Sequence, residues 1–314
     1  MTEQEALACH ESGQQAQAEN RHEAAVALFE RAAAWFAQAE GSQSPDLANV
    51  LADQAESLLE LCRFDPAEQC ARRGVEILEP LRDRLDTQTR AALLPRAYGL
   101  WGRTLRELGR YDEAAGPLLR AIREAEEAFG KDAAAVAGHL NNYGVLCKYY
   151  GKFDEGEQVY RRALALLEKA FGHESPETAT IYHNLGGLEH SRGNFAAGEP
   201  LAHMAYRIRR RTLGEDDTAT VADAVAWGGL LDGLDRYGES VPIYRRALQF
   251  YEAHFGPDHF EVAATLNNLG MACAAQGNRQ EARLHLERCL RIKVRLFGED
   301  HPEVRLTRAT YATL

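Results

Sequence analysis

The stretch Asn141–Gly172 reads NNYGVLCKYYGKFDEGEQVYRRALALLEKAFG, and its characteristic glycines recur every 42 residues along much of the chain. The first glycine recurs as Gly102, Gly144, Gly186, Gly228 and Gly270. The closing pair recurs as Phe129-Gly130, Phe171-Gly172, Leu213-Gly214, Phe255-Gly256 and Phe297-Gly298. Self-similarity at a fixed period of this length is typical of solenoid proteins, in which each repeat is one small structural unit.

Each unit has the pattern of two amphipathic helices. In the quoted copy, apolar residues over 140–147 recur at helical spacing, Gly151 predicts a tight turn, and a second apolar stripe covers 153–167. Gly144 and Ala163 are predicted where the two helices cross, because larger side chains would push the axes beyond about 8–10 Å. A single hairpin cannot bury both of its faces, so the hairpins must stack on their neighbours.

We therefore predict an all-α fold in which the whole chain, residues 1–314, forms one solenoid domain. It comprises seven helical-hairpin repeats, at about 6–42, 45–84, 88–130, 131–172, 173–214, 215–256 and 257–298, followed by a capping helix at 301–314. The loop Gly41–Asp46 separates the first two copies. The second and third copies are 47 rather than 42 residues apart, with the insertion around Leu81–Pro95. Pro95 is expected to end or kink any helix there.

The composition is that of a soluble protein, with 45% hydrophobic and 26% charged residues. No apolar run approaches the roughly 20 residues that span a bilayer, and the N-terminus has neither the basic start nor the apolar core of a signal peptide. The six cysteines show no metal-binding or redox spacing. We therefore expect them to be reduced packing residues in a cytoplasmic protein without membrane insertion.

The net charge of −11 is concentrated at the N-terminus, where residues 1–60 carry −9 and the rest of the chain only −2. An acidic chain without basic blocks argues against nucleic-acid binding. One run of arginines on a predicted second helix comprises Arg207, Arg209, Arg210 and Arg211. We interpret this run as a solvated outer face, with anchoring to an acidic partner as the alternative.

The sequence contains no motif that predicts catalysis. It has no nucleophile elbow, phosphate-binding loop, paired-histidine metal motif or dinucleotide-binding glycine pattern. His183 and His190 lie seven residues apart on one predicted helix, whereas paired ligands on a helix lie about three or four apart. We therefore predict that the chain is not an enzyme and holds neither a metal ion nor another cofactor.

Three positions of each copy are occupied in a consistent way. An aromatic residue or leucine precedes the first glycine (Trp101, Tyr143, Leu185, Trp227, Leu269), an aromatic residue follows the turn (Tyr111, Phe153, Phe195, Tyr237), and small residues recur in the second helix. This pattern resembles the tetratricopeptide repeat over residues 97–304 and more weakly over 6–80, with the aromatic residue missing at Arg279. The 42-residue form, with segments such as His173–Thr178 and His301–Val304, is similar to the repeats of kinesin light chains. The resemblance implies a right-handed superhelix whose concave face, lined by first helices, holds extended peptides.

Each first helix packs through one apolar stripe. On this resemblance, the residues beside that stripe are expected to line the concave surface. We predict that the peptide contacts Arg103, Arg106, Asn141, Asn142, Val145, Lys148, Tyr149, His183, Asn184, Gly187, His190, Asn267 and Asn268. Asn142, Asn184 and Asn268 occupy equivalent positions. An asparagine amide can pair with both the N–H and the C=O of an extended guest backbone. Alternatively, these amides bond a neighbouring helix and stabilise the stack.

The cations Arg103, Arg106 and Lys148 converge in an acidic chain, which favours a guest that carries carboxylates. Alternatively they form a solvated face, with Glu107 near enough to pair with one of them. We therefore predict a non-enzymatic scaffold or adaptor whose protein client places an extended, acidic or C-terminal peptide in the concave groove. The alternative is a peptide-sensing regulatory subunit that switches conformation and controls a partner effector. No oligomeric state is predicted.

Overall fold

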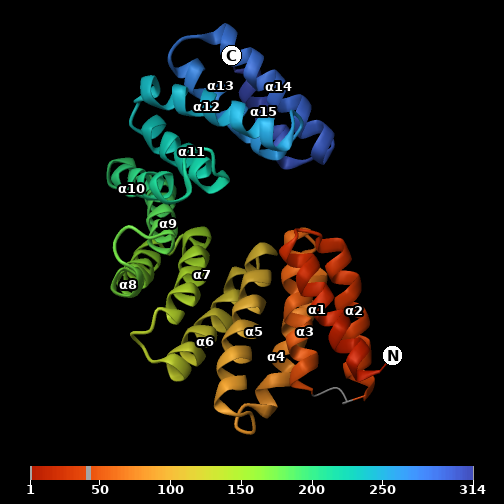
Figure 1. Cartoon of the computed structure of the whole chain (residues 1–314). Coiled ribbons are helices and arrows are strands. Elements are labelled where there is room, and N and C mark those ends of the chain that lie inside the picture. Colours follow the sequence, from red (N-terminus) through yellow and green to blue (C-terminus); the bar gives the residue numbers. More distant parts are fainter. Residues whose placement is uncertain (1, 40–43, 314) are drawn as a thin grey trace. The chain divides into compact units, whose positions relative to one another are not determined.

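The computed structural model describes residues 2–39 and 44–313, and all regular structure in these residues is helical (Figure 1). The α-helices are α1 (Glu3–Ala18), α2 (His22–Ala39), α3 (Pro45–Glu60), α4 (Phe64–Leu78), α5 (Thr87–Glu107), α6 (Tyr111–Phe129), α7 (Ala135–Tyr150), α8 (Phe153–Phe171), α9 (Pro176–Arg192), α10 (Phe195–Leu213), α11 (Thr218–Gly233), α12 (Tyr237–Phe255), α13 (Phe260–Ala275), α14 (Arg279–Phe297) and α15 (Pro302–Ala312). The predicted all-α fold, with helical hairpins and a final single helix, is confirmed. Residues 41–43 of the predicted loop Gly41–Asp46 and the last residue of the predicted cap lie outside the described residues.

The chain divides into two compact units, Met1–Leu166 and Leu167–Leu314, called unit 1 and unit 2 below. Within each unit, helices that follow one another in sequence pack together, and the first helices of successive hairpins also contact one another. In unit 1, α5 contacts both α3 and α7, and in unit 2, α11 contacts both α9 and α13. The first helices therefore share one face of each unit, which we call the first-helix face. The assignment of residues 1–314 to one domain stays a prediction.

The recurring glycines are sites of close helix packing. A Cβ atom on Gly144 would lie 2.6 Å from Cε1 of Tyr160, and one on Gly228 would lie 2.8 Å from Cε1 of Tyr244. Both tyrosines are fully buried, as is Ala163. The predicted packing role of the glycines is thus confirmed, and the group that fills the space is a large side chain of the second helix.

The insertion between the second and third hairpins is absorbed by added helix. A 3-10 helix, η1 (Glu79–Leu81), follows α4, and α5 is 21 residues long with Asp86 as its N-cap. Pro95 lies buried inside α5, so the prediction that a helix would end at this proline is wrong. The proline removes one backbone hydrogen bond, but the helix continues because its first turns are capped and Leu94 and Ala97 pack in the core of unit 1.

A buried carboxylate holds this irregular joint together. The Glu124 side chain is 1% exposed and pairs with Arg82, Arg90 and Arg120 at N–O distances of 3.0–3.1 Å. Burial by itself would raise the pKa of the Glu124 carboxyl, but hydrogen bonds and charge from the arginines lower the pKa overall. The arginines come from the loop after η1, from α5 and from α6, so one carboxylate joins three segments.

The last helix, α15, closes the C-terminal end of unit 2. Its Val304 and Thr307 are buried, and the Thr307 hydroxyl accepts a hydrogen bond from the ammonium of Lys293 on α14. Arg305 and Arg308 are exposed on its outer side. An exposed polar side is what a terminal helix of a repeat array needs, because no further repeat covers it. Among the described helices, none is both long and apolar enough to cross a membrane.

Candidate functional site

A pocket of about 450 Å³ opens on the first-helix face of unit 1. Three of the residues predicted to contact a peptide, Arg103, Asn141 and Asn142, line it. The remaining lining residues come from the same three first helices: Glu56 from α3, Arg96, Gly99 and Leu100 from α5, and Gly138 and His139 from α7. A Cβ atom on Gly138 would meet nothing within 4 Å, so one wall of the pocket is open because a side chain is absent.

The two arginines of this pocket differ in what they are bound to. The Arg96 guanidinium is held by Asp53, by Glu56 at 2.9 Å and by the amide oxygen of Asn49 at 3.2 Å. Arg103 lies two turns further along α5, and no carboxylate among the described residues pairs with its guanidinium. Arg96 therefore joins α3 to α5, whereas Arg103 is available to an incoming anion.

Arg106 and Lys148 bring two more positive charges together between α5 and α7. Arg106 donates to Glu107 at 2.5 Å, as the sequence suggested, but its Nε–H is buried without a partner among the described residues. Lys148 has no carboxylate partner in the described part of the chain, and its ammonium lies 4.8 Å from the centroid of the Tyr149 ring. Burial, and then the charge of Arg106, lower the pKa of Lys148. A bound anion would relieve this repulsion.

Amide and aromatic groups flank these cations on α7. Asn141, Asn142 and Val145 are half-buried. Tyr149 is 57% exposed, and its ring stacks on that of Tyr111 with the centroids 6.5 Å apart. The structure therefore brings the seven predicted residues of unit 1 onto neighbouring turns of two helices that contact each other.

Unit 2 uses the corresponding polar residues differently. Nδ1 of His183 lies 2.7 Å from Oδ1 of Asp223, and Nη1 of Arg209 donates to the same oxygen at 3.0 Å. The Asp223 side chain is fully buried, and its second oxygen has no partner among the described residues. His183 on α9 is therefore tied to α11 through a buried ion-pair network.

The prediction that the arginines of α10 form a solvated outer face is wrong for Arg209. The Arg209 side chain is only 14% exposed, because it reaches Asp223 and donates to the Thr180 hydroxyl at 2.8 Å. A long side chain on a second helix can reach between two first helices, which the charge run by itself does not reveal. The other members are exposed and pair with surface acids, Arg207 and Arg211 with Glu174 and Arg210 with Glu215.

The other predicted residues of unit 2 lie on α9 and α13. His190 is exposed, and its ring meets the edge of the Phe195 ring at a centroid distance of 5.4 Å. The Gly187 carbonyl accepts a hydrogen bond from Ser191 within α9. Asn184 on α9, and Asn267 and Asn268 on α13, are half-buried. No cluster of cations like that of unit 1 includes these residues in the described part of the chain.

Sequence reasoning missed His139, which lies in the wall of the unit 1 pocket. Its Nδ1 atom is buried and has no hydrogen-bond partner among the described residues. Burial lowers the pKa of His139. It lies four residues before Tyr143 and seven before Leu146, on the apolar stripe of the helix, so the repeat pattern predicted packing there and gave no signal of a pocket.

Comparison with sequence families supports the repeat assignment along most of the chain. A tetratricopeptide repeat family model matches residues 4–79, 93–169, 136–197 and 226–293, and a second tetratricopeptide repeat model matches 178–219. The first of these models covers more than half of the chain. No curated protein matches the chain.

Several solved structures share the fold. BtubC (BKLC) from P. vanneervenii is 23% identical with a TM-score of 0.63, over 76% of this chain and 94% of that protein. A kinesin-light-chain-type protein of Podosopora anserina with nearly identical TPR-like repeats is 17% identical with a TM-score of 0.55, over 64% and 96%. A Rap protein complexed with competence and sporulation factor is 13% identical with a TM-score of 0.65, over 98% and 80%. These likenesses confirm the fold class that the repeats predicted.

Proposed function

We propose that this chain, which belongs to the tetratricopeptide repeat family, is a non-enzymatic scaffold that binds an extended acidic peptide segment on the first-helix face of unit 1. One observation carries the proposal. Arg103 and Lys148 lie on this face without carboxylate partners among the described residues, although the chain has 47 acidic residues and a net charge of −11. In such a chain, cations that stay unpaired on a recessed face are suited to an external anion.

The guest chemistry follows from the three cations. Arg103 and Arg106 present planar guanidinium groups, which pair with both oxygens of a carboxylate, whereas the Lys148 ammonium acts as a point charge. The half-buried setting strengthens each contact, because water screens a recessed pair less than a fully exposed one. A segment with two or more aspartate or glutamate side chains, or with a C-terminal carboxylate, would satisfy the site.

The pocket beside Arg103 adds room for one guest side chain. Its walls include Gly99 and Gly138, whose missing side chains keep it open. The amide of Asn142 lies at the same pocket and offers donors and an acceptor to a guest main chain. Bonding between helices stays the alternative prediction for the asparagine row. Contacts of the guest with His183, Asn184, Gly187, His190, Asn267 and Asn268 stay predictions.

A solved relative supports the idea that this fold can hold a ligand. The Rap protein of similar fold was solved with competence and sporulation factor bound. That likeness is one of fold. The acidic guest is inferred from the unpaired cations on the first-helix face of this chain. Affinity around micromolar is expected, because a disordered guest loses conformational entropy when it becomes ordered.

We also propose that the scaffold works in the cytoplasm and has no catalytic role. All six cysteines are free thiols in the described structure. Burial raises the pKa of the Cys147 thiol to about 11, so this thiol is a poor nucleophile at neutral pH. A reducing compartment suits a chain with buried, unpaired thiols.

The test compares two peptides and two variants of the full chain by fluorescence anisotropy. One labelled peptide carries several aspartates and glutamates, and the other has asparagine and glutamine in their place. The first variant carries Arg103→Gln and Lys148→Gln. The matched control, Arg161→Gln with Arg207→Gln, removes the same charge from exposed positions on second helices.

We expect wild type and control to bind the acidic peptide more tightly than the amide peptide, and the first variant to lose that preference. Added salt should weaken the preference, since part of the attraction is screened at an ionic strength of about 0.15 M. The proposal would be contradicted if wild type bound both peptides equally, or if the two variants lost the same amount of affinity for the acidic peptide. A client recovered from lysate by wild type and not by the first variant would then identify the guest.

A further inference from the structure

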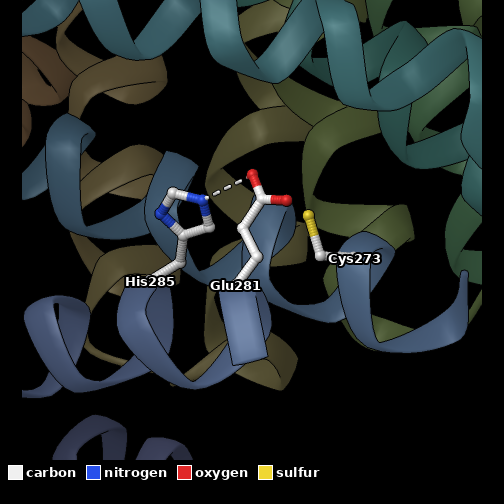
Figure 2. A group of neighbouring side chains, drawn as sticks. All are labelled: Cys273, Glu281 and His285. Atoms are coloured by element: carbon white, nitrogen blue, oxygen red, sulfur yellow. Dashed lines mark hydrogen bonds and ion pairs between the residues drawn. The ribbon is translucent and has the colours of Figure 1, made fainter. Parts of the chain in front are cut away.

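Three side chains of different chemistry converge at the turn between α13 and α14 in unit 2. Figure 2 shows Cys273 from α13 and Glu281 and His285 from α14, with the thiol and the imidazole on either side of the carboxylate. Their sulfur, oxygen and nitrogen atoms all lie within 4.8 Å of one another. Glu281 and His285 are four residues apart, which places them on one face of α14.

The spacing of these atoms suits coordination of one metal ion. Nε2 of His285 lies 3.3 Å from Oε1 of Glu281. Two ligands that each bind a tetrahedral zinc ion at about 2.0–2.2 Å are separated by roughly this distance. The Cys273 thiol is buried beside them, and sulfur bonds to zinc at about 2.3 Å, so the three atoms need to close in by only a small movement.

The surroundings already orient the carboxylate. Nδ2 of Asn278, at the N-terminus of α14, donates to Oε2 of Glu281 at 2.6 Å. This contact turns the other oxygen, Oε1, toward His285. Hydrogen bonds of this kind to a ligating carboxylate fix its orientation and tune the affinity of a metal site.

One cation competes for the same oxygen. Nη2 of Arg245 on α12 donates to Oε1 of Glu281 at 2.7 Å. The Arg245 side chain is 54% exposed, so it can swing into solvent when an ion arrives. A divalent ion bound by a thiolate and a carboxylate would leave a neutral centre, and Arg245 would then no longer be needed as the counter-charge.

We propose that Cys273, Glu281 and His285 bind a zinc ion, with a fourth coordination position open to water or to a ligand from a partner. A set of thiolate, imidazole and carboxylate suits zinc, whereas magnesium and calcium prefer all-oxygen sites. The site uses none of the residues proposed to bind the peptide, so either proposal can fail while the other stands. Such an ion would join α13 to α14 at their shared turn.

The experiment uses the full chain after removal of metal by a chelator. Zinc is titrated against a chromophoric competitor to obtain stoichiometry and affinity, and Co²⁺ is added separately as a spectroscopic probe. We expect one zinc per chain and, with Co²⁺, a near-ultraviolet charge-transfer band that reports a sulfur ligand. Magnesium in the place of zinc should give no measurable competition.

Variants assign the ion to this cluster. Cys273→Ser, Glu281→Gln and His285→Gln should each weaken zinc binding at least about 100-fold, since loss of even a supporting contact costs roughly 10–100-fold. Cys289→Ser, on the same helix pair, and Cys62→Ser, at an exposed cysteine, are matched controls that should bind as wild type does. Circular dichroism establishes that each variant is folded. Glu281→Gln and His285→Gln are less expected to disturb the core than Cys273→Ser, because their side chains are 27% and 22% exposed whereas Cys273 is buried.

Arg245→Gln provides a test in the opposite direction. Because Arg245 competes for the Glu281 oxygen, its removal should tighten zinc binding. No zinc bound at micromolar concentration, no sulfur-to-cobalt band, or zinc binding that survives in all three ligand variants would overturn the proposal. The cluster would then be a hydrogen-bonded chain of thiol, carboxylate and imidazole within the protein.

Discussion

The first-helix faces of the two units differ in charge at equivalent positions. Four residues after the repeat glycine, unit 1 has Arg106 and Lys148, whereas unit 2 has His190, Asp232 and Ala274. In unit 1, burial and then the neighbouring charge of Arg106 lower the pKa of Lys148. In unit 2 the carboxylate of Asp232 accepts hydrogen bonds from Ser240 and Tyr244, and burial raises its pKa.

The two faces also differ in where their charged groups find partners. In unit 2, His183 and Arg209 meet the buried Asp223, so charge is neutralised between helices of the same unit. In unit 1, Arg103 and Lys148 have no carboxylate partner among the described residues. The same helical hairpin can therefore use its first-helix face to hold the stack together or to attract a ligand, and the difference lies in a few side chains.

The largest expected effect is on the internal network of unit 2. Asp223→Ala should destabilise the protein by about 3–5 kcal/mol, because it leaves Arg209 buried without its carboxylate and His183 without its partner. Urea unfolding followed by circular dichroism measures the loss. Asp216→Ala, at a carboxylate that is 86% exposed, is the control and should change stability by no more than about 0.5 kcal/mol. If the two substitutions had similar effects, the buried network of Asp223 would not be what distinguishes unit 2 from unit 1.

The next effect concerns the unpaired cations of unit 1. Arg103→Glu combined with Lys148→Glu should weaken binding of the acidic peptide about 100-fold, which corresponds to about 2.8 kcal/mol. The physical reason is that attraction at both positions becomes repulsion. Isothermal titration calorimetry measures the affinity, and Arg161→Glu with Arg207→Glu is the matched reversal on second helices. Unchanged affinity in the first variant would show that unit 1 does not use these cations.

A third pair of substitutions separates the packed side of α7 from its open side. Gly144→Ala should cost about 1–3 kcal/mol, because the new Cβ would lie 2.6 Å from the buried Tyr160 ring. Gly138→Ala meets nothing within 4 Å and should stabilise the protein by roughly 0.4–1 kcal/mol, since alanine loses less conformational freedom on folding. Thermal and urea unfolding of both variants give the comparison. Equal costs would mean that the pocket wall is as tightly packed as the helix crossing.

The smallest expected effect is a pH dependence that originates at the pocket of unit 1. Burial lowers the pKa of His139 below the ordinary value of about 6.5, so between these two pKa values the unfolded chain binds more protons than the folded one. Stability should therefore fall as the pH drops below about 6.5 and be regained on return to neutral pH. His139→Gln should reduce this slope in urea unfolding at several pH values. An unchanged slope would assign it to other groups.

Repeat spacing predicted the hairpins well, but it was a poor guide at places where one residue depends on distant ones. Pro95 was expected to end or kink a helix, and α5 does not end there, because the surrounding core holds the turn. Arg209 was assigned to solvent, yet it reaches a buried aspartate. His139 and the cluster of Cys273, Glu281 and His285 were not identified, because their partners or walls come from neighbouring helices.

In the predicted contact surface, too, helical periodicity predicted some features and neighbouring helices decided others. The sequence predicted that these seven residues of unit 1 lie on first helices, and they do, on α5 and α7, because helix positions follow directly from periodicity. It did not distinguish Arg96, which is held by Asp53 and Glu56, from Arg103, which has no such partner among the described residues. Both arginines have the same residue type and nearly the same face, so only the positions of α3 and α7 separate them.

The amino-acid sequence by itself determined the helices, their pairing into hairpins and the glycines at the crossings, because these depend on local periodicity and on steric size. Tertiary structure decided which charges are neutralised and which stay available. The partners of His183 and Arg96 lie 40 and 43 residues away in the chain, about one repeat. Charge pairing acts over a few ångströms in space, so it is set only when the hairpins stack.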